Sequence, residues 1–451
     1  MSDLEGIVRI MLERGVERRE IINKLCEEML FYKRIPRSAS EKIAEIILEE
    51  VLNSLKSCEG SSRDFFCSKE SGVSAGLMGV GSRGFGDFFF HRLLAGFNSV
   101  SVEGSSGDLD DAGWFKSGDK WIITAVDGIH SRLAYFPLLA GFHAARAAAR
   151  DVMVKGGVVR GFLLDLRISD DGDISYLLEL EAGVAAVSRF LEAPILGGST
   201  LRMGGDMVIG RRIVGTVFAV GESYRRPKSR KQIEPGHVLL MSEGSGGGTI
   251  ATTAIFSGEY EIALKTINFR TLRLLKSIVS SDKIDLIDSM FDVTNGGLRG
   301  DLNEISKTAG VGFIVEYDRI IDLIDPSIRM MLEKHQIDPL GVSLDSIVMA
   351  VRREHADEII EFGRSIGVRI EVIGESIREK NVLIRSGGEV RRMETKYRES
   401  AYTKIKKFIG EEAPPDLESI LSRVKKISEE IMSLRDKLYE YATMNTSSSY
   451  R

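Results

Sequence analysis

Cysteine and proline are scarce in this chain of 451 residues, which contains three cysteines and nine prolines. Cys26, Cys58 and Cys67 have neither the paired spacing of a zinc site nor the number of a disulfide framework, so we expect reduced thiols. No apolar run approaches the roughly 20 residues that cross a bilayer. The first residues lack the basic-then-apolar order of a signal peptide. These absences predict a cytoplasmic protein with no membrane partner.

An excess of basic residues is also missing. Lysine and arginine number 61 against 66 aspartates and glutamates, which gives a formal net charge of -5. A protein that coats nucleic acid usually carries a basic surplus, so we expect no nucleic-acid partner. With 43% hydrophobic and 28% charged residues, the composition is that of an ordinary globular protein, and the length allows two or three domains.

Both ends of the chain have helical patterns. Apolar residues recur at helical spacing over residues 1–57, with a break at Pro36 and a capping box from Ser38 to Glu41, and a polar linker follows over residues 58–74. From residue 414, apolar residues alternate steps of three and four, the heptad of a coiled coil. Packing on the chain's own body explains this pattern equally well. The helices could also bind a protein partner, and we expect residues 445–451 to be disordered.

Carboxylates crowd into a short loop in the first half of the chain. Asp108, Asp110 and Asp111 lie in a glycine-flanked stretch, and Asp127 ends the β-branched strand that follows. Such a loop is either a solvated turn or a set of hard oxygen ligands for Mg²⁺, which often brings phosphates with it. Asp151 follows an alanine-rich helical stretch, so it is either a further ligand or the partner of Arg146 or Arg150.

Three glycine-rich stretches accompany the carboxylates, at residues 79–87, 242–249 and 292–300. Closely spaced glycines let backbone N–H groups approach an anion, although tight turns need glycine as well. Strands and helices alternate around them, and residues 346–373 predict a βαβ unit. The basic run at residues 225–231 is interpreted as a solvated linker between two domains.

The order and spacing of four motifs resemble the AIR synthase (PurM-like) superfamily. Asp110-Asp111-Ala112 resembles its Gly-Asp-Asp-Ala signature, and Asp127-Gly128 resembles the aspartate that closes the next strand. Residues 150–157 and 292–305 are similar to its Asn-Asp…Met-Gly-Gly stretch and its second-domain motif. The superfamily includes HypE, thiamine-monophosphate kinase and selenophosphate synthetase. The loop at residues 81–88 looks most like archaeal AIR-synthase-related proteins, including the methanogenesis-marker-2 group.

The resemblance implies an α+β fold of two domains that pairs into a homodimer. It implies an ATP- and Mg²⁺-dependent enzyme that phosphorylates an oxygen of a small-molecule or protein-borne substrate. The implied domains are residues 73–224, which bind ATP and Mg²⁺, and residues 225–400. Helical extensions occupy residues 1–72 and 401–451.

The resemblance also assigns roles to residues of this chain. The implied metal ligands are Asp110, Asp111, Asp127 and Asp151. The implied catalytic residues are Asp292, Asn295 and Arg83. The implied nucleotide-binding residues are the four metal ligands together with Gly81, Gly84, Gly86, Asp87, Gly128, Gly197 and Gly198.

Two positions depart from the superfamily pattern. Ser199 stands where a carboxylate is expected after the glycine pair, and Arg150 replaces the asparagine before Asp151. Both changes weaken a metal site. They keep open the alternative of a nucleotide-binding regulatory or scaffold protein whose catalytic site has decayed.

Overall fold

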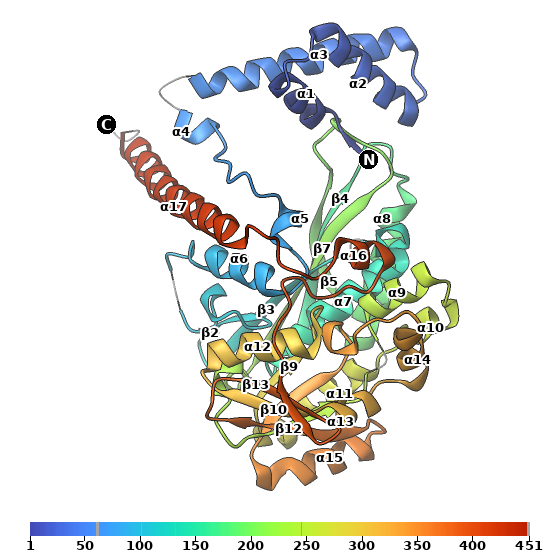
Figure 1. Ribbon diagram of the computed structural model, residues 1–451, viewed down its shortest axis with the longest axis vertical. Helices are drawn as coiled ribbons and strands as arrows, with labels where there is room; N and C mark the ends of the chain where they lie inside the picture. Colours follow the sequence, from blue (N-terminus) through green and yellow to red (C-terminus); the bar gives the residue numbers. More distant parts are fainter. Residues whose placement is uncertain (60–62, 101, 131, 245, 449–451) are drawn as a thin grey trace.

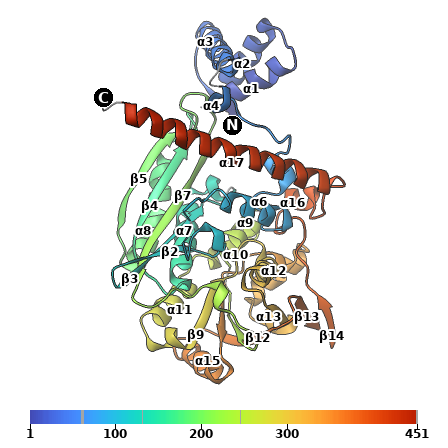
Figure 2. The ribbon, with the colours of Figure 1, turned by 90° about the vertical axis from the view of Figure 1, so that its left-hand side faces the viewer.

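The computed structural model describes residues 1–59, 63–100, 102–130, 132–244 and 246–448. A body of two β-sheets and their helices carries a small helical unit at its N-terminal end and a long helix at its C-terminal end (Figure 1). Turned by 90°, the same ribbon shows the long helix crossing the body beside the first sheet (Figure 2). In the described part of the chain, no helix is both long and apolar enough to cross a membrane.

The N-terminal unit consists of three helices whose apolar faces meet in their own small core. Strand β1 (Ser2–Asp3) pairs with β6 (Val208–Ile209) of the body, and Ile209 is buried in the same core. The expected capping box is wrong, because Pro36 occupies the N-cap position and Ser38 already lies in the helix. The helices are α1 (Leu4–Glu13), α2 (Arg18–Tyr32) and α3 (Arg37–Lys56).

The segment after α3 corrects the expectation of reduced thiols. Cys58 and Cys67 form a disulfide with their Cα atoms 5.3 Å apart, whereas Cys26 is free and buried. Short helical turns, η1 (Ser57–Glu59) and α4 (Arg63–Phe66), lie in this segment. Cysteine spacing alone does not reveal such a turn.

The first sheet has five strands in the order β2-β3-β7-β4-β5. Along β7, Val217 and Ala219 point into the core while Phe218 between them is exposed, the alternation of a sheet with one covered face. Helices α7 (Pro137–Val154) and α8 (Ser175–Leu191) contribute to that core. The strands are β2 (Gly113–Ser117), β3 (Lys120–Gly128), β4 (Val158–Ile168), β5 (Ile195–Arg202) and β7 (Ile213–Ser223).

The second sheet has seven strands in the order β14-β13-β10-β12-β8-β11-β9. The central strands β8 (Val238–Ser242) and β11 (Ile347–Val351) are buried along their whole length, which their unbroken apolar runs anticipate. The βαβ unit expected over residues 346–373 is present as β11, α15 and β12, but β8 lies between its two strands. The other strands are β9 (Ile287–Asp292), β10 (Gly312–Glu316), β12 (Ile370–Ile377), β13 (Val382–Ser386) and β14 (Glu389–Arg392).

Helices surround the second sheet. They are α9 (Gly248–Ser257), α10 (Tyr260–Lys265), α11 (Arg270–Val279), α12 (Gly297–Ala309), α13 (Tyr317–Asp322), α14 (Pro326–Lys334), α15 (Ala356–Ser365) and α16 (Lys404–Ile409). Short 3₁₀ turns connect elements of both sheets: η2 (Ser106–Asp108), η3 (Leu133–Tyr135), η4 (Arg230–Gln232), η5 (Asp282–Leu286), η6 (Pro339–Gly341) and η7 (Arg353–His355).

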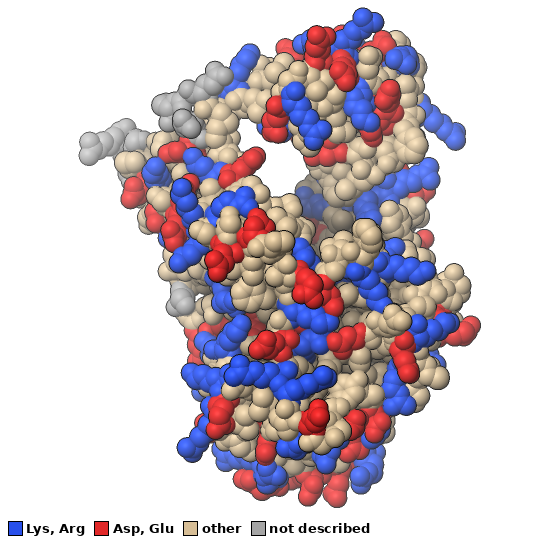
Figure 3. All heavy atoms as spheres, viewed as in Figure 1, with Lys and Arg blue, Asp and Glu red and all other residues tan. Residues whose placement is uncertain are grey.

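The basic segment between the sheets is not simply solvated, which corrects the sequence-based interpretation. Arg230 is only 2% exposed, and the neighbouring cations are paired with acidic side chains: Arg225 with Asp285, Arg226 with Glu103 and Lys231 with Asp108. Over the face shown in Figure 3, lysine and arginine are interspersed with aspartate and glutamate.

The C-terminal helix α17 (Leu417–Ser448) packs on the chain's own body, one of the two alternatives for its heptad pattern. Ile420 and Val424 are buried with Met78 of α5 (Ala75–Met78) and beside apolar residues of α6 (Phe85–Ala95). Residues 445–448, expected to be disordered, continue the helix because its backbone bonding continues. Residues 449–451 lie outside the described residues.

Candidate active site

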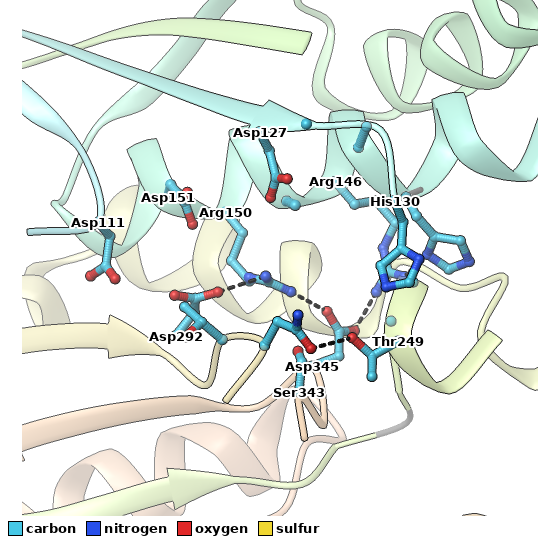
Figure 4. A pocket seen from close by; sticks show the side chains of 18 of the residues that line it. Asp111, Asp127, His130, Arg146, Arg150, Asp151, Thr249, Asp292, Ser343 and Asp345 are labelled. Carbon is cyan, nitrogen blue, oxygen red and sulfur yellow. Dashed lines mark hydrogen bonds and ion pairs between the residues drawn. The ribbon is translucent and has the colours of Figure 1, made fainter. Parts of the chain in front are cut away.

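A cavity of about 340 Å³ lies between the two sheet domains. The first domain contributes the end of β3 and one face of α7. The second domain contributes the end of β9, the N-terminus of α9 and the loop before β11 (Figure 4). Of the residues implied by the resemblance, Arg83, Asp110, Asp111, Asp127, Gly128, Asp151, Asp292 and Asn295 line it.

Asp110 and Asp111 are held by cationic side chains of the chain itself. The Lys155 ammonium lies 2.6 Å from Asp110 Oδ1 and 2.8 Å from Asp111 Oδ2. The Arg230 guanidinium pairs with Asp111 Oδ1. Burial raises the pKa of Asp111, but Arg230 and Lys155 outweigh it, so the pKa lies below its usual value. Both carboxylates are therefore already paired with cations of the chain.

Asp127 and Asp151 are in the opposite situation. Both are half-buried in the cavity wall, and no described lysine or arginine forms an ion pair with either. Burial, which the Arg150 charge only partly offsets, raises the pKa of Asp127 to about 7. Burial and the Asp292 charge raise the pKa of Asp151 well above its usual value. These two carboxylates lack a counter-ion, and a cation bound between them would lower their energy.

Asp292 belongs to a chain of alternating charges along the cavity floor. Arg150 lies 2.6 Å from Asp292 Oδ2 and 2.6 Å from Asp345 Oδ1, and Arg146 also pairs with Asp345 (Figure 4). Burial lowers the pKa of Arg150, but the two carboxylates outweigh it and raise the pKa. Arg150 thus neutralises Asp292 rather than Asp151, which is the sequence neighbour.

The glycine-rich loop before α6 has its amides turned toward Asp87. The Asp87 carboxylate accepts hydrogen bonds from the backbone N–H groups of Gly81, at 3.0 Å, and Arg83, at 2.8 Å. A Cβ on Gly84 or Gly86 would lie 2.4 Å from Tyr397 O or 2.3 Å from Met78 O, so close backbone packing requires both glycines. None of Gly81, Gly84, Gly86 and Asp87 lines the cavity.

Arg83 and Asn295 tie this loop to the second domain. The Arg83 guanidinium lies 3.9 Å from Asp301 and 3.8 Å from Glu304, and Asn295 donates to Gly81 O at 3.3 Å. Arg83 also has a φ of 56°, a left-handed conformation that costs energy for a residue with a Cβ.

The glycine pair Gly197 and Gly198 lies on β5 outside the cavity lining.

At the far end of the cavity, Thr249 belongs to the glycine-rich stretch noted in the sequence, whereas sequence reasoning missed His130, His143, Ser343 and Asp345. Their only signal is the position of His130 three residues after Asp127, since the others come from separate stretches of sequence. Burial, followed by the charges of Lys406 and Arg132, lowers the pKa of His130 to about 4, so the ring is neutral.

Hydrogen bonds define the tautomer of His130. The Thr252 hydroxyl donates to Gly248 O at 2.8 Å, so it must accept from His130 Nδ1, 3.0 Å away. His130 Nε2 then accepts from the Tyr402 hydroxyl at 2.6 Å. Both ring nitrogens form hydrogen bonds, and through them His130 links the end of β3 to α9 and to the segment before α16.

Two sheet domains with acidic and glycine-rich motifs at their junction define a protein of AIR-synthase type. Models of the AIR synthase related protein family match residues 109–222, as its N-terminal domain, and residues 234–385, as its C-terminal domain. The chain belongs to this family. The match confirms the resemblance and the two-domain α+β fold.

Individual relatives agree with this assignment. The uncharacterized protein MJ1416 of Methanocaldococcus jannaschii is 40% identical over 448 residues, which cover 98% of each chain. Among solved structures, the HypE-HypF complex gives a TM-score of 0.55 at 20% identity, covering 68% of this chain and 99% of that chain. The hydrogenase maturation protein HypE in complex with ATP gives 0.51 at 19%, covering 64% and 89%. AaThiL complexed with AMPPCP and TMP gives 0.53 at 18%, covering 69% and 95%.

Proposed function

We propose that this protein is an ATP-dependent, Mg²⁺-requiring phosphoryl-transfer enzyme that acts on an oxygen of a small or protein-borne substrate. The observation that carries the proposal is the Asp127–Asp151 pair, two half-buried carboxylates in one cavity without an ion-pair partner among the described residues. Structurally similar proteins in complex with ATP or AMPPCP support a nucleotide as the ligand.

The residues of the cavity fit a magnesium ion held mainly by its substrate. The described residues contain no cluster of three or more His, Cys, Asp or Glu side chains suited to a metal. Mg²⁺ commonly uses one or two carboxylates, several waters and the substrate phosphates, so two carboxylates suffice. Asp127 and Asp151 would hold the ion, and the ion would neutralise phosphate charge during transfer.

The remaining residues of the cavity would bind and orient the substrates. The N-terminus of α9 opens into the cavity beside Thr249 and Asn295, and its free N–H groups favour an anionic group there. Arg83, which lines the same cavity, adds positive charge from the first domain. We assign Asn295 and Arg83 to positioning of phosphate and Asp292, through its pair with Arg150, to the charge balance of the cavity floor.

A nucleotide-binding protein without turnover is the second candidate. The Arg150–Asp292 ion pair favours it, because Arg150 lies 2.6 Å from Asp292 Oδ2 and occupies the position that an acceptor hydroxyl would need at that oxygen. Ser199 supports it too, since this position lies on β5 with an exposed side chain and no carboxylate.

Calorimetric titration with a non-hydrolysable ATP analogue, with and without Mg²⁺, tests the proposal. We expect Mg²⁺-dependent binding in the wild type and at least tenfold weaker binding in Asp151→Asn, about 1.4 kcal/mol or more. Asp165→Asn is the matched control, because Asp165 pairs with Arg167 on β4 outside the cavity. Absence of binding to the folded wild-type protein would refute nucleotide binding. Binding without ATP turnover over a panel of acceptors would favour the second candidate.

A further inference from the structure

The Lys155 ammonium lies inside a cage of four oxygen atoms and is completely buried. Its Nζ is 2.6 Å from Asp110 Oδ1, 2.8 Å from Asp111 Oδ2, 2.7 Å from Met290 O and 3.2 Å from Lys228 O. Two carboxylates and two backbone carbonyls form the kind of oxygen set that hard divalent cations prefer. A lysine nitrogen thus occupies a position whose surroundings suit a metal ion.

Arg230 completes the neutralisation of the same carboxylates. Its guanidinium pairs with Asp111 Oδ1 and lies 3.7 Å from Asp110 Oδ1 and from Glu304 Oε2. The remaining oxygen, Asp110 Oδ2, accepts from the Ser229 hydroxyl at 2.8 Å and from the Arg230 N–H at 3.0 Å. Every carboxylate oxygen of Asp110 and Asp111 therefore has a partner from the chain itself.

We propose that Lys155 and Arg230 are built-in cations that take the place of a divalent metal at Asp110 and Asp111, so that the chain binds divalent ions only at Asp127 and Asp151. Loss of Lys155 or Arg230 would leave buried negative charge without compensation. Loss of Asp110 or Asp111 would leave buried positive charge without compensation. A divalent ion entering the cage would have to displace the ammonium from all four oxygen atoms. The proposal concerns the cavity of the proposed function but does not require that nucleotide binds.

The arrangement also joins the two domains without a metal. Lys155 follows α7 of the first domain, Met290 belongs to β9 of the second, and Lys228 lies in the connecting segment. Arg230 reaches from that segment to Asp111 on one side and Glu304 of α12 on the other. Closure of the domains at this point therefore requires no divalent ion.

Binding of Mn²⁺ to the full-length protein without nucleotide tests the proposal, by electron paramagnetic resonance and by thermal unfolding. Lys155→Ala empties the cage, so this variant should bind about one more Mn²⁺ per chain than the wild type, with a rise in Tm on adding Mn²⁺ that exceeds the wild-type rise. Adding Asp111→Asn to Lys155→Ala removes a ligand of the cage and should abolish the additional Mn²⁺. A Lys155→Ala variant that folds and gains no Mn²⁺ would overturn the proposal.

A second comparison decides the matter even where Lys155→Ala does not fold. In the wild-type background, Asp111→Asn should leave Mn²⁺ binding unchanged, whereas Asp151→Asn should reduce it. Loss of wild-type Mn²⁺ binding in Asp111→Asn would show that the metal reaches these carboxylates despite Lys155 and would overturn the proposal. Since no nucleotide is present, these outcomes are separate from failure of the proposed function.

Discussion

Asp111 and Asp127 lie in the wall of one cavity, yet their pKa values are shifted in opposite directions. Desolvation raises the pKa of both. For Asp111, Arg230 and Lys155 outweigh desolvation, whereas for Asp127 the more limited influence of Arg150 does not. The position of a cation, rather than the carboxylate itself, thus decides which aspartate remains available to a ligand.

Asp127→Asn should stabilise the metal-free protein at neutral and alkaline pH. The folded-state pKa of about 7 lies above the usual value of 3.8, so the unfolded chain releases this proton first as pH rises. The stability contributed by protonated Asp127 is complete below about pH 4 and is lost as pH rises through about 7. The variant's advantage should grow over that interval to on the order of 4 kcal/mol.

Thermal unfolding of both proteins in the presence of a chelator, from pH 4 to pH 8, measures this difference. Equal stability of the two proteins at pH 8 would contradict the assignment of Asp127 as an uncompensated buried carboxylate. Addition of Mg²⁺ with an ATP analogue should stabilise only the wild type. The carboxylate that destabilises the metal-free protein would then be the one that binds the ion.

The sequence identified the carboxylates but not the cations that hold two of them. Aspartates in a glycine-flanked loop form a local pattern that a single stretch of sequence displays. Lys155 and Arg230 lie far along the chain from residues 110–111, and the basic run around Arg230 has the composition of a solvated linker. Folding of the first domain brings Lys155 to these carboxylates, and the segment between the domains brings Arg230, so no periodicity or local spacing could predict either contact.

At the scale of elements, the loop before α6 is organised by Asp87 rather than by a ligand. Asp87→Ala removes an acceptor from the N–H groups of Gly81 and Arg83 and should cost about 3 kcal/mol, since each bond involves a charged acceptor. Hydrogen exchange should become faster at these two amides and remain unchanged in α2 and α3. Asp87→Asn, which retains one acceptor oxygen, should have a smaller effect. Unchanged exchange at both amides would show that the loop is held by other contacts.

Whether a segment forms a helix or a strand was easier to predict than where it begins and what it packs against. Apolar periodicity predicted the helices at both ends, because a helix shows its buried face in its own sequence. The capping box failed, since the preferred backbone conformation of Pro36 already starts α3 two residues earlier than Ser38 suggested. The heptad periodicity predicted helix α17 but left open whether a coiled-coil partner or the chain's own body packs against it. Only the position of Met78, Phe89 and Phe90 beneath the helix shows that the chain's own body does.

At the scale of the whole molecule, the first sheet has one face that its own helices do not cover. Val126, Phe218 and Leu163 stand opposite one another on β3, β7 and β4, and they are 52%, 38% and 37% exposed. An apolar row in the middle of a sheet is unusual on a surface that faces water. We propose that a second copy of the chain covers this face and forms the homodimer that the family resemblance implies.

The C-terminal half of α17 is an alternative surface for dimer formation, because Leu438 is 55% exposed and Tyr441 is 53% exposed. Phe218→Glu would place a charge in the middle of the sheet interface, where desolvation without a partner should weaken association at least tenfold, about 1.4 kcal/mol or more. Leu438→Glu, the matched control on the helix, should leave association unchanged. Sedimentation velocity over a range of protein concentrations distinguishes the two surfaces. Monomers from Leu438→Glu together with intact dimers from Phe218→Glu would assign the interface to α17, and a monomeric wild type would exclude both.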